Sequence, residues 1–157
     1  MTGARHLACR TMIGRICQRD VDLAEADEPV RFAAERMHQR AVGSLVIVDE
    51  KQTPIGIVTD RDLTIRVLAA GRDADTTPVR DVMTSSPVTI REDEPIEFAV
   101  KKMRQGTFRR IPVVDKSGVL VGLVSVDDIL GLLVEEFTDV GALLECESPK
   151  ALVTGRL

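Results

Sequence analysis

The sequence predicts an α/β fold, more narrowly α+β, built from two copies of one small unit. An offset of 66 residues aligns residues 27–62 with residues 93–128 without a gap, and twelve of these 36 positions are identical. In each copy, a stretch with helical apolar spacing precedes two short β-branched runs and a second helical stretch. One copy of about 50 to 60 residues would be marginally stable alone. We therefore expect two helix-strand-strand-helix units, each with a short extra strand, packed sheet to sheet with pseudo-two-fold symmetry.

The first helix of each unit is predicted at residues 27–40 and 93–106. Pro29 and Pro95 stand where a first helical turn tolerates proline, and the acidic residues ahead of them favour the positive end of the helix dipole. Apolar residues then fall at i, i+3, i+4 and i+7 and make one stripe per helix. These residues are Val30, Ala33, Ala34 and Met37, and Ile96, Ala99, Val100 and Met103.

A β-hairpin and a second helix complete each unit. The predicted strands are residues 44–49 and 55–59 in the first copy, and 110–115 and 119–125 in the second. The second helices are predicted at residues 60–71 and 126–137, the first of them closed by Gly71 in a left-handed conformation. Short extended segments precede the units at Val21 to Ala24 and at Val88 to Ile90.

These elements predict the domain boundaries along the chain. A stretch rich in Asp, Thr and Ser with Pro78 separates the two copies, as is typical of a linker. The expected parts are an N-terminal arm (1–11), repeat 1 (12–71), a linker (72–81), repeat 2 (82–137), and a C-terminal helix end and tail (138–157). The apolar stripe of the last helix continues at helical spacing and favours core or a dimer seam over a docking helix.

Composition excludes several classes of function. The 157 residues carry 21 Lys and Arg against 25 Asp and Glu, so nucleic acid is an unlikely partner for a chain of net charge −4 that lacks Trp and Tyr. The apolar runs are too short to cross a bilayer, which predicts a cytoplasmic location with no membrane partner. The three cysteines have no metal-ligand spacing, and no nucleophile or phosphate-loop motif is present. We therefore expect no metal, no catalytic residue and no enzymatic activity.

One local pattern occurs twice and has two interpretations. Thr59 with Asp62, and Ser125 with Asp128, have the spacing of a helix capping box, which requires no ligand. The same position leaves backbone N–H groups and a hydroxyl at a helix N-terminus, where a phosphate is well placed. Capping and ligand binding can share these residues, so both interpretations stay open.

Four motifs, placed in corresponding positions of the two units, resemble those of a tandem pair of cystathionine-β-synthase (CBS) domains over residues 12–137. They are "GIVTDRD" and "GLVSVDD" after the hairpins, "RRIPVVD" before the second hairpin, and "VRDVMTSSPVTI" at the start of the second unit. The resemblance implies a regulatory sensor that binds an adenosine-containing ligand in clefts between the repeats, such as AMP, ADP, ATP, S-adenosylmethionine or NAD. It implies no obligatory cofactor, a homodimer, and a regulated protein that the sequence does not identify.

The resemblance also implies two sites, in which the hydroxyl residue reaches phosphate and the aspartate holds the ribose. The first, expected to be the better site, consists of Cys17, Asp22, Val42, Gly43, Arg110, Leu123, Ser125, Asp127 and Asp128. The second consists of Ile57, Thr59, Arg61, Asp62, Thr84, Val88, Phe108 and Arg109. Ser44 matches Arg110 in the second site, so that basic residue is missing there. Arg61 and Arg109 are the candidates to replace its charge.

A second function remains open beside the sensor. Degenerate clefts would leave a scaffold that works by dimerisation or docking. The serine at position 44 favours this alternative for one site, whereas the set Arg110, Ser125 and Asp128 opposes it for the other.

Overall fold

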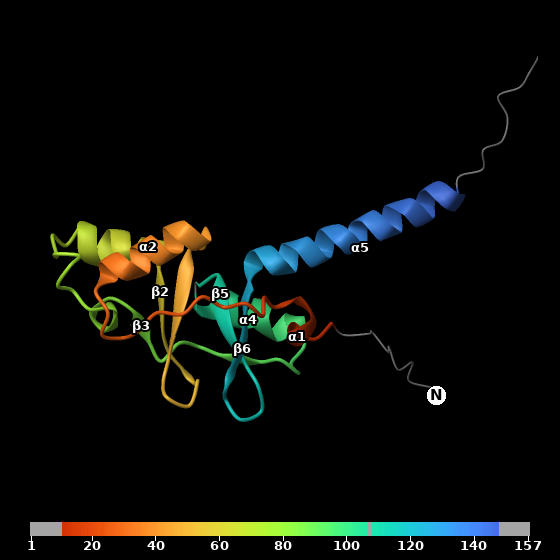
Figure 1. Cartoon of the computed structure of the whole chain (residues 1–157). Coiled ribbons are helices and arrows are strands. Elements are labelled where there is room, and N and C mark those ends of the chain that lie inside the picture. Colours follow the sequence, from red (N-terminus) through yellow and green to blue (C-terminus); the bar gives the residue numbers. More distant parts are fainter. Residues whose placement is uncertain (1–10, 107, 148–157) are drawn as a thin grey trace, which may run out of the picture.

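The computed structural model describes residues 11–106 and 108–147. Figure 1 shows two α/β units side by side and a long C-terminal helix that projects away from them. The elements of the first half are α1 (Ile13–Ile16), α2 (Val30–Arg40), β1 (Ser44–Val48), β2 (Pro54–Thr59), α3 (Asp60–Leu63) and the π-helix η1 (Thr64–Leu68). Those of the second half are the 3-10 helix η2 (Val79–Asp81), β3 (Thr84–Ser85), β4 (Ile90–Arg91), α4 (Ile96–Gly106), β5 (Arg110–Val114), β6 (Leu120–Ser125) and α5 (Val126–Glu147).

Each unit contains a three-stranded sheet, in which the predicted hairpin supplies two neighbouring strands. The strand orders are β1-β2-β3 and β4-β5-β6, and both hairpins are antiparallel, with Ser44 opposite Thr59 and Arg110 opposite Ser125. The extended segments lie parallel to the first hairpin strand, through a bridge from Leu23 to Val46 and through the pairing of β4 with β5. The predicted α/β class with two repeated units is confirmed.

Two apolar cores lie between the sheets and their helices. In the first, Ala33 and Met37 of α2 pack with Leu45 and Ile47 of β1. In the second, the counterparts Ala99 and Met103 of α4 pack with Ile111 and Val113 of β5. Because side chains alternate along a strand, the fully buried Val46 and Pro112 lie on the opposite faces of β1 and β5. Both faces of β1 and of β5 are therefore covered, as sheet-to-sheet packing requires.

The segment that precedes each repeat crosses onto the sheet of the other repeat. Thr84 of β3 pairs with Ile57 of β2, and Gln18 forms the matching bridge with Leu123 of β6. The short helices α1 and η2 also pack on the other repeat, since Ile13 of α1 is buried in the second core and Val79 of η2 in the first. Each core is therefore completed by residues from the other half of the chain.

This exchange explains the glycine that is repeated in both hairpins. A Cβ on Gly122 would lie 2.7 Å from Cys17 Sγ and 2.9 Å from the Gln18 carbonyl oxygen. A Cβ on Gly56 would meet the side chain of Met83, which is the repeat counterpart of Cys17. Glycine is therefore needed at both positions because the crossing segment lies directly over the second hairpin strand.

The structure differs from the predicted second helices. Residues 60–71 form a four-residue α-helix and a π-helix rather than one α-helix, and Gly71 has the expected left-handed φ of +66°. In repeat 2, α5 continues beyond residue 137 as one helix of 22 residues. Gly71 adopts the left-handed conformation that ends a helix easily, whereas its counterpart in repeat 2 is Phe137, which does not favour that conformation.

The part predicted as a linker includes residues of the first core. Residues 79–81 form η2, and Val79 and Val82 are fully buried. The proposed boundaries of the arm, linker and repeats remain predictions, and most of the arm and of the tail lies outside the described residues.

Candidate functional site

Two clefts lie at the seam between the repeats. The first has a volume of about 200 Å³. Its wall combines residues 18–22, residues 41–44 at the junction of α2 and β1, strands β5 and β6, and the start of α5. The second has a volume of about 470 Å³, and its wall combines β2 and α3 of repeat 1 with β3 and the start of β5 from repeat 2. Only the second lies within the range of about 300 to 1,000 Å³ that is typical of small-molecule sites.

The first cleft brings together eight of the nine residues predicted for it. They are Asp22, Val42, Gly43, Arg110, Leu123, Ser125, Asp127 and Asp128. Cys17 does not line the cleft, because its side chain packs into the second core, where burial raises the pKa of the thiol. The neighbouring Gln18 lines the cleft instead, and its Nε2 donates to Asp128 Oδ1 at 3.4 Å.

The second cleft brings together every residue predicted for it. They are Ile57, Thr59, Arg61, Asp62, Thr84, Val88, Phe108 and Arg109. Asp60, Ser86, Pro87 and, above all, Arg110 line it as well. Sequence reasoning had placed Arg110 in the first cleft alone, because only the tertiary structure shows that its side chain reaches both.

Sequence reasoning also missed several residues of the first cleft. They are Gln18, Asp20, Val21, Ala41 and Ser44. Their proximity in sequence to Asp22, Val42 and Gly43 was the available signal, although it could not show which neighbours face the cleft. Asp20 and Asp22 both pair with Arg40, whose Nε donates to Asp22 Oδ1 at 2.8 Å. This hydrogen bond raises the pKa of Arg40 above its ordinary value.

Both repeated hydroxyl-aspartate pairs form capping boxes. Asp62 Oδ2 accepts from the Thr59 backbone N–H at 3.0 Å and from Thr59 Oγ1 at 2.7 Å, while the Asp62 N–H donates to Thr59 Oγ1. Ser125 and Asp128 repeat this pattern at 2.7, 2.6 and 3.2 Å. In each aspartate, Oδ2 is held by the cap, and Oδ1 has one further contact, with Gln18 Nε2 at 3.4 Å for Asp128 and with Arg66 Nη2 at 3.3 Å for Asp62.

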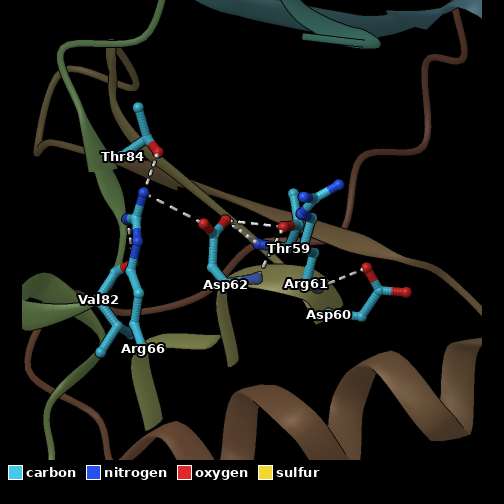
Figure 2. A network of polar contacts seen from close by, with 7 residues as sticks. All are labelled: Thr59, Asp60, Arg61, Asp62, Arg66, Val82 and Thr84. Atoms are coloured by element: carbon cyan, nitrogen blue, oxygen red, sulfur yellow. Dashed lines mark hydrogen bonds and ion pairs between the residues drawn. The ribbon is translucent and has the colours of Figure 1, made fainter. Parts of the chain in front are cut away.

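The capping box of the second cleft is tied to the other repeat, as Figure 2 shows. Arg66 in the π-helix lies 3.3 Å from Asp62 Oδ1 and donates to the Val82 carbonyl at 2.6 Å and to Thr84 Oγ1 at 3.4 Å. Its repeat counterpart is Leu132, which can make none of these contacts. The segment that opens repeat 2 is therefore anchored to the second cleft by a charged link that the first cleft lacks.

The two clefts differ in the charge of their walls. The wall of the first contains four carboxylates, from Asp20, Asp22, Asp127 and Asp128, and one guanidinium, from Arg110. The wall of the second contains two carboxylates, from Asp60 and Asp62, and three guanidinium groups, from Arg61, Arg109 and Arg110. Arg40 pairs with Asp20 and Asp22, and Arg109 pairs with Asp127, so part of the negative charge of the first wall is offset. Among the described residues, Arg61 and Arg110 form no ion pair, which makes the second cleft the better place for an anion.

Residues 11–106 and 108–147 contain neither a metal-binding cluster nor a membrane-spanning helix. No group of three or more His, Cys, Asp and Glu side chains there is arranged to hold a metal ion. No helix in the same ranges combines the length and the apolar character needed to cross a membrane.

Comparison with known proteins decides the family. The CBS domain family model matches the chain twice in tandem, at residues 13–69 and 79–135. The chain belongs to the CBS domain family. The two matches correspond to the two repeats, and the solved structures with similar folds include CBS domain pairs.

Two curated relatives and one solved structure illustrate the similarity. Protein MK0525 of Methanopyrus kandleri is 41% identical over 118 residues, which are 75% of this chain and 60% of the relative. A 17.7 kDa protein of Acidianus ambivalens is 30% identical over 128 residues, which are 82% of this chain and 76% of the relative. The CBS domain pair of protein MJ0100, solved with 5′-methylthioadenosine and S-adenosyl-L-methionine, has a TM-score of 0.73 at 28% identity and covers 81% of this chain and 98% of that one.

Proposed function

We propose that this CBS domain pair is a regulatory module that binds an adenosine nucleotide such as AMP, ADP or ATP and signals its occupancy to a protein partner. The observation that carries the proposal is the second cleft, where Thr59, Asp62, Arg61, Arg109 and Arg110 surround about 470 Å³ at the seam of the repeats. The ligands of the MJ0100 domain pair, both adenosine derivatives, support this class of ligand.

Each part of a nucleotide has a suitable partner in this cleft. Asp62 Oδ1, which Arg66 contacts at 3.3 Å, has a second lone pair that can accept from a ribose hydroxyl while Oδ2 maintains the cap. Arg61 and Arg109 are exposed. The guanidinium of Arg61 can pair with phosphate oxygens through two parallel N–H donors, and Arg109, whose Nη2 donates to Asp127 Oδ1 at 3.3 Å, has further N–H donors for the same purpose. Ile57, Val88 and Phe108 provide apolar surface for the adenine base. The ligand would contact both repeats and thereby stabilise one arrangement of the seam.

We therefore propose the second cleft as the principal nucleotide site, in place of the first cleft that the sequence favoured. From the sequence, Arg110 was assigned to the first cleft alone, and for that reason only the first cleft had a complete set of basic, hydroxyl and aspartate residues. The larger volume of the second cleft and its excess of guanidinium groups support the reversed order.

A thermal melt tests the proposed function. Because the chain has no Trp or Tyr, an external dye should report unfolding in the presence of AMP, ADP, ATP, S-adenosylmethionine, NAD or cyclic di-AMP. A ligand at 100 times its dissociation constant adds about 2.7 kcal/mol to the free energy of unfolding, which corresponds to a rise in Tm of about 5–10 °C for a domain of this size. If no nucleotide at millimolar concentration changed the Tm, the scaffold alternative would replace the sensor.

We also propose that the module forms a homodimer through α5. Leu130, Leu133, Phe137 and Val140 follow a three-four spacing along this helix and are all exposed, Phe137 to 75%. This stripe also favours the scaffold function, since it provides a contact surface independent of the clefts. A second copy would cover it with an identical, self-complementary stripe.

The variant Phe137→Asp is expected to convert the dimer into a monomer, because it places a charge in the centre of the apolar stripe. Light scattering coupled to gel filtration measures the change in mass. Glu135→Gln, on the same helix but outside the stripe, is the matched control and should remain dimeric. A dimer that survives Phe137→Asp would place the interface elsewhere.

A further inference from the structure

One arginine lies at the boundary between the two clefts. Arg110 lines the first cleft beside Gly43 and Ser125, and it lines the second beside Thr59 and Arg109. In the described part of the chain it forms no ion pair. Its guanidinium is therefore a charge that either cleft could recruit.

The approach of Arg110 to repeat 1 explains how it reaches both clefts. A Cβ on Gly43 would lie 3.3 Å from Arg110 Nη2 and 3.4 Å from Asp60 Oδ2. Gly43 belongs to the wall of the first cleft, whereas Asp60 belongs to the wall of the second. The Asp60 N–H donates to the Gly43 carbonyl at 3.3 Å, so the walls of the two clefts meet at these residues, and the guanidinium lies beside this junction.

The repeat symmetry shows that a second arginine is missing. The counterpart of Arg110 at the offset of 66 residues is Ser44, which stands at the same place on the other hairpin, opposite Thr59. Ser44 is 6% exposed and too short to reach the second cleft as a cation would. A symmetric module would have one such arginine per cleft, but this chain has one for both.

We propose that the shared Arg110 makes the two clefts compete, so that the chain holds one phosphorylated nucleotide at a time. This inference rests on the proposed nucleotide-binding function. A phosphate in the second cleft attracts Arg110 away from the wall of the first. That wall then contains four carboxylates and no guanidinium, and Arg40 and Arg109, which lie outside it, pair with three of the four. A second anion is consequently disfavoured there, and by linkage an anion in the first cleft disfavours one in the second to the same extent. An uncharged nucleoside does not require Arg110 and escapes the competition.

Isothermal titration of the full chain with AMP and with adenosine tests the competition. We expect one AMP per chain, with any second AMP at least about 10-fold weaker, and two adenosines per chain. The variant Ser44→Arg restores the missing cation and is expected to bind two AMP molecules. If the small volume of the first cleft were the cause instead, adenosine would also bind once and Ser44→Arg would change nothing.

The outcomes separate this inference from the proposed function. Two AMP sites of equal affinity in the wild-type chain, or a single AMP site in a folded Ser44→Arg protein, would overturn the shared arginine while leaving nucleotide binding intact. If Ser44→Arg does not fold, the adenosine stoichiometry of the wild-type chain decides. Binding of neither AMP nor adenosine would contradict the proposed function itself.

Discussion

Replacing Asp62 with alanine is expected to weaken AMP binding by roughly 10- to 150-fold, which corresponds to about 1.5–3 kcal/mol for hydrogen bonds to a charged group. Asp62 lies in the wall of the larger cleft, and its Oδ1 is the oxygen that the capping box leaves available. The variant keeps the Thr59 cap but loses the reciprocal hydrogen bond from the Thr59 N–H to Asp62 Oδ2, which costs about 0.5–1.5 kcal/mol of stability in addition. Titration calorimetry well below the Tm of the variant measures the change in affinity.

The second repeat provides a matched control for this substitution. Asp128→Ala removes an equivalent capping box, in which Asp128 Oδ2 accepts from Ser125, and should cost a similar amount of stability. Because Asp128 lines the smaller, acidic cleft, we expect its effect on AMP affinity to be small. A larger loss of affinity in Asp128→Ala than in Asp62→Ala would restore the order of sites that the sequence favoured.

The substitution Gly122→Ala is expected to lower the free energy of unfolding by about 1–3 kcal/mol, because the added methyl group overpacks a buried contact. It would lie 2.7 Å from Cys17 Sγ and 2.9 Å from the Gln18 carbonyl, and the latter cannot move without breaking the bridge to Leu123. Chemical denaturation followed by far-UV circular dichroism measures the loss.

Gly56→Ala is the symmetric control for Gly122→Ala. All of the nearest atoms at Gly56 belong to the Met83 side chain, which has several rotatable bonds and can move aside. We therefore expect a smaller loss of stability than at Gly122. Equal losses in the two variants would show that the crossing backbone of residue 18 is not the cause.

The sequence alone was sufficient to predict the repeated unit and its elements. The gapless offset of 66 residues, the helical apolar spacing and the β-branched runs depend only on local spacing, and α2, α4 and both hairpins form where they indicate. The stripes were predicted too wide, since Ala34 and Val100 are exposed. The capping boxes were predictable for the same reason, since a hydroxyl and an aspartate three residues apart meet within one helical turn. The residues of the second cleft followed from the family resemblance.

Only the tertiary structure decided how the two repeats share their parts. The crossing of Gln18 and Thr84 onto the opposite sheets, the link from Arg66 to Val82, and the position of Arg110 between the clefts all join residues far apart in the chain. Local sequence patterns cannot predict such contacts. A long arginine side chain at a seam can reach either side, and which groups surround its guanidinium depends on how the two sheets pack.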